Sequence, residues 1–314
     1  VFCTGMHQLK LYGSTAEEVK KYHFTNVYHY INQHIGEPME MILANTITGL
    51  SSYTEENPCD MIVVHGDRVE ALAGAIVGMI KNIMVSHIEG GERSGTVDEM
   101  LRHAVSKLSH FHFVSNEEAA NRVKQMGEQP EKVFVIGSPD IDVMRSENLP
   151  SLETVKKYYE IGFDKYAMVL FHPVTTEKNT MEENARMFVE ALLQDKNNYV
   201  VVYPNNDEGT SHILDAYKAL ADHERFRIYP SIKFERFLVL LKNAEFCIGN
   251  SSAGIREAPF YGVPTVNIGT RQKNRASHSS IINCGYKTED ILNAIQNAKN
   301  IGVVDISSYF GKGD

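Results

Sequence analysis

Short apolar segments rich in β-branched residues alternate with helical patterns along most of the chain. Strands are expected at 60–66, 82–88, 110–115, 132–138, 165–173, 198–205, 225–231, 245–251 and 264–269. Helices are expected at 69–80, 97–109, 116–126, 178–194, 210–223, 233–243, 253–261 and 287–299. Continuously apolar strands that alternate with helices are typical of parallel sheets covered on both faces. The pattern therefore predicts an α/β fold.

A polar, proline-containing stretch, ENLPSLETV at 147–155, interrupts this alternation near the middle of the chain. A length of 314 residues suits two domains or one large α/β unit. We predict two doubly wound, Rossmann-like domains, 1–146 and 147–314, that face each other across a cleft. The helix at 70–80 is apolar almost all round, so it is expected to be deeply buried or to lie at a subunit interface.

The charge balance excludes some classes of partner. Lys and Arg number 31 against 40 Asp and Glu, which gives a net charge of -9 and argues against nucleic acid or an anionic membrane surface. A small anionic ligand stays compatible with a locally basic pocket. The longest apolar stretch, 71–80, is about half of the ~20 residues that a membrane helix needs, and no signal peptide is recognisable. We expect no membrane association.

The four cysteines are far apart and form no CxxC pair, which argues against a zinc knuckle or a redox dithiol. They are Cys3, Cys59, Cys247 and Cys284. Reduced thiols in the cytoplasm are the simpler interpretation.

Polar and charged residues gather where the expected strands end. The segments are HGDR (65–68), HIEGGE (87–92), GSPD (137–140), FHPVTTE (171–177), YPNND (203–207), GNSSAG (249–254) and GTRQ (269–272). In open α/β sheets, ligands bind outside the carboxyl ends of the strands. We expect the functional site to be built from these segments.

In the second half, GNSSAGIRE places Ser251 and Ser252 at a helix start, where free N–H groups favour an anion. Simple N-capping by serine is the alternative. Glu257, about one turn further in, is suited to hold sugar hydroxyls. Arg271 can neutralise a phosphate by a forked contact or be a surface charge. Together they predict a nucleotide-diphosphate site, and no Walker-type or GxGxxG motif is present.

Three further residues stand at expected strand ends. His172, before Pro173, is either a ligand contact or a structural hydrogen bonder. Asp67 and Arg68 follow the strand at 60–66, and Asp67 can instead cap the helix that begins at Val69.

The segment HIEGGERSGTVDEMLRH (87–103) adds several carboxylates, of which Glu89 and Asp98 are candidates for chemistry. Asp98 and Glu99 can instead stabilise a helix start, and Glu92, Glu99 and Arg102 are better explained as structural. Glycines 90, 91 and 95 would let the backbone turn close to a sugar. A metal site from His87, Glu89 and His103 lacks a recognised ligand spacing, so no metal is expected.

The segments HGDRVEALAG, HIEGGERSGTVDEMLRHAVSKLSH, FHPVTTE and GNSSAGIREAPFYGVPTVNIGTRQ resemble the hydrolysing UDP-N-acetylglucosamine 2-epimerases, particularly the bacterial enzymes of sialic-acid synthesis. The resemblance runs from TGMH (4–7) nearly to the end. Non-hydrolysing epimerases are less similar in the HIEGGExSGTxD segment.

The resemblance implies a glycosyltransferase-B-like fold with the active site between its domains. It also implies elimination of UDP from UDP-GlcNAc to give 2-acetamidoglucal, followed by hydration to N-acetylmannosamine. Asp67, Glu89 and Asp98 match the catalytic carboxylates, with Asp67 and Glu89 assigned to the elimination and Asp98 to the hydration. The matching nucleotide-binding residues are Arg68, His172, Ser251, Ser252, Glu257 and Arg271. His7 matches a residue near the sugar and phosphate.

The family further implies a homodimer or homotetramer without a cofactor. It begins with a strand and a GTR-type loop, after which this chain starts, and its C-terminal crossing helix is expected to be absent here. Two alternatives remain open. One is a sibling enzyme for a diacetamido-trideoxy sugar nucleotide of legionaminic-acid synthesis, and the other is a sugar-nucleotide-binding protein without catalysis.

Overall fold

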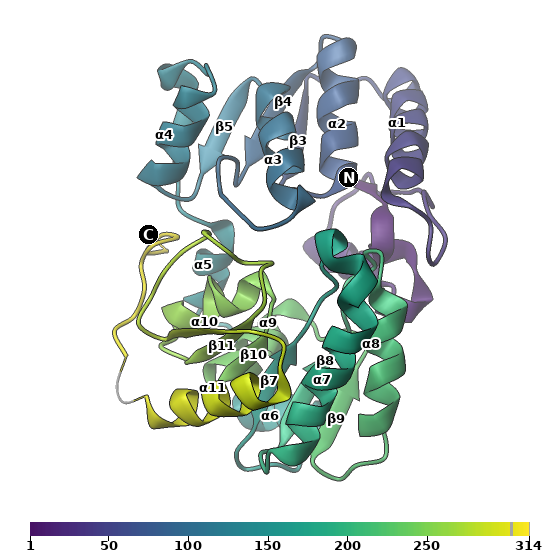
Figure 1. Ribbon diagram of the computed structural model, residues 1–314. Helices are drawn as coiled ribbons and strands as arrows, with labels where there is room; N and C mark the ends of the chain where they lie inside the picture. Colours follow the sequence, from purple (N-terminus) through teal and green to yellow (C-terminus); the bar gives the residue numbers. More distant parts are fainter. Residues whose placement is uncertain (302–303, 314) are drawn as a thin grey trace. The chain divides into compact units, whose positions relative to one another are not determined.

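The computed structural model describes residues 1–301 and 304–313, which form two compact units. Unit 1 comprises Val1–Arg93 and Val97–Ser138. Unit 2 comprises Ser94–Thr96 and the chain from Pro139 onward. In Figure 1, unit 1 runs from purple to blue-green and unit 2 continues through teal and green to yellow.

Unit 1 contains a four-stranded parallel sheet in the order β3-β4-β5-β6. The strands are β3 (Met61–His65), β4 (Met84–Ile88), β5 (Phe111–Val114) and β6 (Val133–Val135). The helices between and after them are α2 (Val69–Ile80), α3 (Val97–Lys107), α4 (Glu117–Gln125) and the 3-10 turn η4 (Pro130–Lys132). All four strands and three helices foreseen for this half are confirmed within a few residues.

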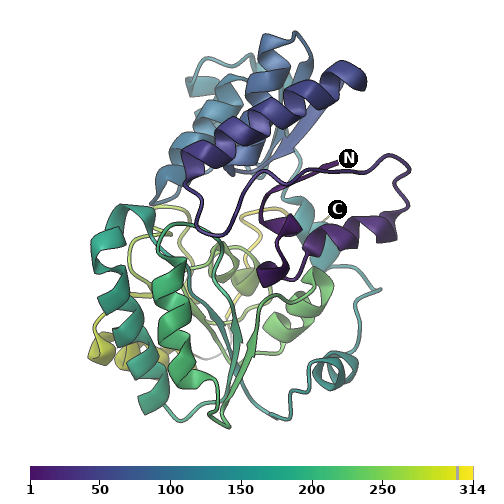
Figure 2. The same cartoon turned by 90° about the vertical axis from the view of Figure 1, so that its right-hand side faces the viewer.

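Preceding this sheet is a segment that the apolar pattern did not predict. A parallel pair, β1 (Phe2–Cys3) and β2 (Tyr28–His29), forms a separate two-stranded sheet. The 3-10 helices η1 (Gly5–Gln8), η2 (Lys10–Tyr12) and η3 (Thr15–Tyr22) connect its strands. Helix α1 (Met39–Glu56) follows and packs along α2, as Figure 2 shows in dark blue.

Helix α2 is buried along most of its length, because α1, α3 and the sheet all pack against it. Of the two positions foreseen for this apolar helix, deep burial is therefore the one observed. Burial of β3 is one-sided: Val64 is buried, whereas Met61 and Val63 are exposed. The expected burial of both faces does not extend to this strand.

Unit 2 contains a six-stranded parallel sheet in the order β12-β11-β10-β7-β8-β9. Its strands are β7 (Ala167–Leu170), β8 (Tyr199–Val202), β9 (Phe226–Tyr229), β10 (Cys247–Gly249), β11 (Thr265–Ile268) and β12 (Ile281–Cys284). The chain builds outward from β7 to β9, returns to place β10 beside β7, and then builds outward on the other side. This reversal makes the β7–β10 boundary the switch point of a doubly wound sheet.

Helices cover both faces of this sheet (Figure 1). They are α5 (Pro139–Met144), α6 (Leu152–Tyr158), α7 (Met181–Gln194), α8 (Thr210–Tyr217), α9 (Phe234–Lys242), α10 (Glu257–Phe260) and α11 (Thr288–Asn300). The short 3-10 helices are η5 (Thr175–Thr180), η6 (Lys218–Leu220) and η7 (Ser252–Gly254). Val169 of β7 packs with Phe188 of α7, whereas its neighbour Met168 packs with Leu240 of α9. This two-sided burial is why the strand is continuously apolar.

Unit 2 differs from the expectations in several details. The helix foreseen at 253–261 is divided into η7 and α10, and neither β12 nor the helices α5 and α6 were foreseen. The division between the units falls between Ser138 and Pro139, earlier than the polar stretch at 147–155. The reason is that α5 already belongs to unit 2, where Ile141 and Met144 pack against Leu238 of α9. Within the described residues, no helix is both long and apolar enough to cross a membrane.

Candidate active site

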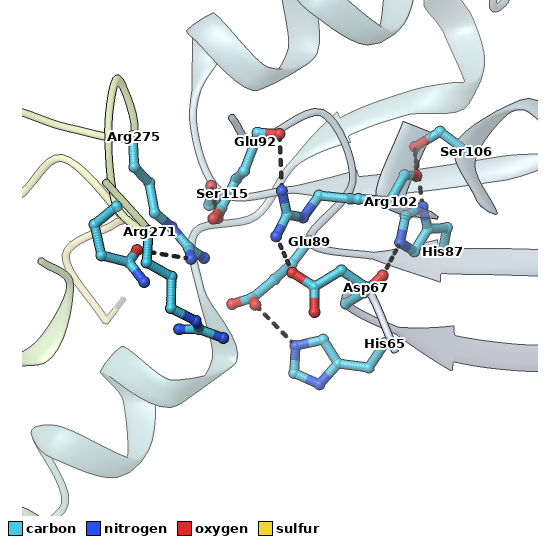
Figure 3. Close-up of polar contacts among 12 residues, drawn as sticks. His65, Asp67, His87, Glu89, Glu92, Arg102, Ser106, Ser115, Arg271 and Arg275 are labelled. Carbon is cyan, nitrogen blue, oxygen red and sulfur yellow. Dashed lines mark hydrogen bonds and ion pairs between the residues drawn. The ribbon is translucent and has the colours of Figure 1, made fainter. Parts of the chain in front are cut away.

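The carboxyl ends of β3 and β4 bring together the residues of HGDR and HIEGGE in unit 1. His65, the last residue of β3, places Nε2 3.0 Å from Oε2 of Glu89, which follows β4 (Figure 3). The other carboxylate oxygen of Glu89 accepts a 2.5 Å hydrogen bond from the Ser138 hydroxyl. Both oxygens of the Glu89 carboxylate therefore have a partner, and the side chain is only 8% exposed.

The backbone of Glu89 has an uncommon conformation. Its φ is 64°, in the left-handed region that side-chain-bearing residues rarely adopt. The Glu89 N–H continues the ladder by donating to the Phe113 carbonyl of β5 at 2.7 Å. Strained backbone of this kind persists where the surrounding structure over-determines it, and it is common at functional sites.

Asp67 forms an ion pair with Arg102 of α3, through Oδ2 and one guanidinium nitrogen (Figure 3). A second nitrogen of Arg102 donates to the Glu92 carbonyl at 3.0 Å. The Glu92 carboxylate in turn accepts a 2.9 Å hydrogen bond from Ser115 after β5. Arg102, judged structural from the sequence, thus contacts a candidate catalytic carboxylate directly, and Glu92 is connected to that carboxylate through Arg102.

His87 is fully buried and hydrogen bonded at both ring nitrogens. Nε2 lies 2.9 Å from the Gly66 carbonyl and Nδ1 lies 3.0 Å from the Ser106 hydroxyl. A carbonyl can only accept, so Nε2 carries the proton. The Ser106 hydroxyl lies between Nδ1 and the Arg102 carbonyl, to which it donates at 3.1 Å. Burial lowers the pKa of His87 from 6.5 to about 4, against the opposing effect of the Gly66 hydrogen bond. The imidazole is therefore neutral near pH 7 and supports the loop before Asp67.

The remaining candidates of unit 1 lie on nearby elements. Asp98 is half-buried in the first turn of α3. The guanidinium of Arg68 lies 3.9 Å from the Glu70 carboxylate. His7 bonds through Nδ1 to the Thr15 hydroxyl at 2.6 Å. A Cβ added to Gly5 would lie 2.6 Å from Glu70, so the TGMH loop lies against the start of α2, next to Arg68.

The structure gives a different reason for the glycines of HIEGGE from the one expected, which was close approach to a sugar. A Cβ at Gly90 would lie 2.8 Å from Oγ of Ser106, and one at Gly91 would overlap the Ala119 carbonyl oxygen. The protein's own packing therefore requires the absence of side chains at 90 and 91.

Among residues 1–301 and 304–313, no group of three or more His, Cys, Asp or Glu side chains is arranged to hold a metal ion.

In unit 2 the switch point between β7 and β10 brings FHPVTTE and GNSSAG together. Asn250, which is fully buried, donates to the His172 carbonyl at 2.8 Å and accepts from the His172 N–H at 2.7 Å. The preceding Gly249 has a φ of 140°, and a Cβ there would overlap the Leu170 carbonyl oxygen. These two residues hold the ends of β7 and β10 in close contact.

The ring of His172 has a defined tautomer. Its Nδ1 accepts a 3.0 Å hydrogen bond from the Asn205 N–H, which follows β8. In the neutral ring Nε2 then carries the proton. Nε2 is therefore the donor atom of the neutral His172 ring, and a donor is the kind of group that an anionic ligand requires.

The loop after β11, which carries Arg271, is held from several sides. The Glu177 carboxylate accepts hydrogen bonds from the hydroxyls of Thr270 and Tyr286, the latter at 2.7 Å. Gln272 donates to the Asn250 carbonyl at 2.9 Å, and Arg271 donates to the same oxygen at 3.4 Å. Arg271 is thus placed at the switch point.

The serines and Glu257 have structural contacts of their own. Ser251 Oγ accepts a 3.3 Å hydrogen bond from the Ala253 N–H, as the simple capping alternative predicts, and Ser252 begins η7. Glu257 is buried beside Arg256, with 3.8 Å between Oε1 and Nε.

Several contributors to the two clusters were not among the candidates, among them His65, Arg102, Ser138 and Asn250. His65, Ser138 and Asn250 stand inside the strand-end segments HGDR, GSPD and GNSSAG, so that position could have singled them out. Arg102 lies 35 residues from its carboxylate partner, and no local spacing connects the two.

Comparisons with known proteins agree with the resemblance seen in the motifs. The family model described as UDP-N-acetylglucosamine 2-epimerase matches residues 1–314. A UDP-N-acetylglucosamine 2-epimerase of Neisseria meningitidis serogroup B is 51% identical over 312 residues, which are 99% of this chain and 82% of that protein. The hydrolyzing UDP-N,N'-diacetylbacillosamine 2-epimerase of Legionella pneumophila is 33% identical over 99% of this chain and 83% of its own.

A solved structure confirms the fold class. The UDP-GlcNAc 2-epimerase of Methanocaldococcus jannaschii, in complex with UDP-GlcNAc and UDP, superposes with a TM-score of 0.76 at 20% identity, over 99% of this chain and 95% of that one. The predicted α/β fold of parallel, glycosyltransferase-B-like units is therefore observed. From its motifs, its fold and its match over the full length, the chain belongs to the UDP-N-acetylglucosamine 2-epimerase family.

Proposed function

We propose that this protein is a hydrolysing UDP-GlcNAc 2-epimerase, which converts UDP-GlcNAc and water to N-acetylmannosamine and UDP for sialic-acid synthesis. The observation that carries the proposal is the placement of Asp67 and Glu89 at neighbouring strand ends with unlike partners. Asp67 pairs with an arginine and Glu89 with a histidine. Two carboxylates in different environments suit a reaction that needs both a base and an acid.

The chemistry has two steps. A base removes the C2 proton, the C1–O bond breaks, and UDP leaves with the bonding electrons, which gives 2-acetamidoglucal. Water then adds its hydroxyl to C1 while C2 receives a proton on the opposite face. We assign Asp67 and Glu89 to the elimination and Asp98 to the hydration. The two steps together need no oxidant or reductant.

The same proposal places UDP at the switch point of unit 2. There His172 offers its Nε2 proton and Arg271 its guanidinium, and both loops are held by Asn250. Arginine suits a diphosphate because its fork can donate two parallel hydrogen bonds. Arg68, Ser251, Ser252 and Glu257 complete the proposed nucleotide contacts, and His7 is proposed to lie near the sugar and phosphate.

Two observations favour hydrolysis over epimerisation with retention of UDP. The segment HIEGGERSGTVD is more similar to the hydrolysing branch. The Legionella relative, whose name states hydrolysis, is 33% identical over nearly the whole chain. Because of the name of that relative, UDP-N,N'-diacetylbacillosamine is the second substrate to compare with UDP-GlcNAc.

The test is incubation of the protein with UDP-GlcNAc in deuterated water, followed by NMR. We expect free N-acetylmannosamine deuterated at C2, together with UDP. UDP-N-acetylmannosamine as the stable product would contradict hydrolysis. Turnover of UDP-N,N'-diacetylbacillosamine alone would assign the sibling activity, and no turnover with either substrate would overturn the enzymatic proposal. Asp67→Asn and Glu89→Gln should each abolish turnover and leave the affinity for UDP within about threefold.

We further propose a cytoplasmic location and assembly as a homodimer or homotetramer. All four cysteines are free, which supports a reducing compartment. Assembly rests on the resemblance to the family. Sedimentation of the purified protein tests it, and a monomer at micromolar concentration would contradict it.

A further inference from the structure

Arg102 contacts both strand-end loops of unit 1, the one after β3 and the one after β4, from a third element. It lies on α3, and its side chain is 2% exposed. Figure 3 shows its guanidinium between Glu92 and Asp67. One guanidinium nitrogen contacts Asp67 after β3, and another contacts the Glu92 carbonyl after β4 at 3.0 Å. A buried guanidinium needs this kind of compensation, because an unpaired charge is costly away from water.

The network extends to a third strand end. Glu92 is buried, and its carboxylate accepts from Ser115 after β5. The loop that begins at Glu89 and ends at Glu92 is thus fixed at its far end by side chains from α3 and β5. A displacement of Arg102 would therefore move the loop and Asp67 together.

The charge of Arg102 matters as much as its shape. Arginine stays protonated at every pH that a folded protein survives. A permanent cation beside a carboxyl group favours its ionised form. Glu89 differs, because its partner His65 belongs to a residue type that titrates near neutral pH.

We propose that Arg102 is a positioning residue of the active site, which keeps Asp67 ionised and fixes its orientation relative to the loop that carries Glu89. The inference rests on the proposed function, in which Asp67 takes part in proton abstraction. A base of this kind has to be unprotonated and correctly oriented before the substrate arrives.

Other charged and titratable groups also surround this corner of unit 1. They are His7 of η1, His65 of β3, Arg68 after β3, Glu70 of α2, His87, Glu89 and Glu92 of β4 and its loop, and Asp98, Glu99 and His103 of α3. A test has to separate the effect of Arg102 from theirs.

The chain offers a matched control in Arg122 of α4. Its guanidinium also donates to a carbonyl of the same loop, that of Gly91, but its carboxylate partner is the exposed Glu118. Arg122→Gln therefore removes an arginine that contacts the same loop, and it leaves the Arg102–Asp67 ion pair unaltered.

The experiment follows the Asp67 carboxyl carbon by NMR in protein labelled with ¹³C-aspartate, with the signal assigned through Asp67→Asn. In Arg102→Gln we expect the titration midpoint of Asp67 to move to higher pH, and in Arg122→Gln we expect it to stay. Arg102→Lys keeps the charge without the fork, so its midpoint should stay near that of the unaltered protein. An unmoved midpoint in Arg102→Gln, or an equal movement in Arg122→Gln, would overturn the inference.

Kinetics provide the second measurement. In Arg102→Gln we expect kcat to fall about tenfold to hundredfold, KM to change less than about threefold, and the acidic limb of the pH–rate profile to move to higher pH. Arg102→Lys should lower kcat without moving that limb. If Arg102→Gln does not fold, Arg102→Lys alone decides: unchanged kcat overturns the inference. If the midpoint of Asp67 moves in Arg102→Gln but the unaltered protein turns over no substrate, the proposed function is refuted and the contact is not. If the protein turns over substrate and the midpoint does not move, only this inference is refuted.

Discussion

The side-chain amide of Asn250 hydrogen bonds to both backbone polar groups of His172, at 2.7 Å to the N–H and 2.8 Å to the carbonyl. The two residues are 78 positions apart in the chain and meet because β7 and β10 are neighbours at the switch point. One buried amide thus replaces the ladder hydrogen bonds that end where the strands diverge. It also places His172 beside the loop of Ser251.

Asn250→Ala should destabilise the protein by about 2–4 kcal/mol, because two backbone groups of His172 lose their hydrogen-bond partner. It should also weaken UDP binding at least tenfold. Urea unfolding and calorimetric titration with UDP measure the two effects. The matched control is Asn243→Ala on the surface of the same unit, where the Asn243 amide donates to the Val239 carbonyl and a change within about 0.5 kcal/mol is expected. Equal effects of the two substitutions would show that the buried amide has no special role.

Gly249→Ala should be severely destabilising, by about 2–4 kcal/mol, since both its φ of 140° and the overlap with the Leu170 carbonyl oppose a side chain. Thermal unfolding measures the loss. Gly162→Ala is the control, because a Cβ there meets nothing within 4 Å and the φ of Gly162 is not in the left-handed region. A Gly249→Ala protein as stable as the Gly162→Ala protein would contradict the described backbone.

Stability should fall as the pH drops from about 6.5 to about 4, partly because of His87. Its pKa is about 4 in the folded protein and about 6.5 in an unfolded chain, so in this window the unfolded state binds more protons. The stabilisation is fully present above pH 6.5 and amounts to about 3 kcal/mol, from 2.5 pKa units at 1.36 kcal/mol each. Burial also lowers the pKa of His103 and His112, which act in the same direction.

His87→Gln should therefore be less stable than the unaltered protein at pH 7.5, yet lose less stability between pH 7.5 and pH 5. Urea unfolding at the two pH values gives the comparison. His34→Gln, at an exposed position, serves as control and should keep the full pH dependence. If His87→Gln loses as much stability between pH 7.5 and pH 5 as the unaltered protein, His87 is not a cause of the pH dependence.

His65→Gln should lower kcat about tenfold or more, because Glu89 loses a partner that can exchange protons with solvent while keeping a neutral hydrogen-bond donor. The affinity for UDP should stay within about threefold, since the proposed UDP contacts at the switch point belong to unit 2. Steady-state kinetics and UDP titration separate the two quantities. An unchanged kcat across the pH range would exclude His65 from proton transfer.

Periodicity was sufficient to predict nine of the strands, because each is a short apolar run between helical segments. It failed for β12 and for the pair β1 and β2, which are short or partly exposed and bury little apolar surface. The helix foreseen at 253–261 was interrupted because Ser251 caps η7 and the chain turns again before α10.

Position at strand ends also predicts Asp67, Glu89, His172 and Arg271 as site candidates from the sequence alone. The reason is general: parallel strands all end at one edge of a sheet, so residues after different strands become neighbours. Residue type and order along the chain are enough for this inference.

Only the tertiary structure shows which partner each of these residues has. Arg102 pairs with Asp67, Ser138 with Glu89, and Asn250 with His172, across separations of 35, 49 and 78 residues. Local spacing cannot encode such pairs, because each depends on the order of strands in the sheet and on helix packing. The types of residue at the candidate site can thus be predicted from the amino-acid sequence. The charge and orientation of each carboxylate, in contrast, depend on contacts that exist only after folding.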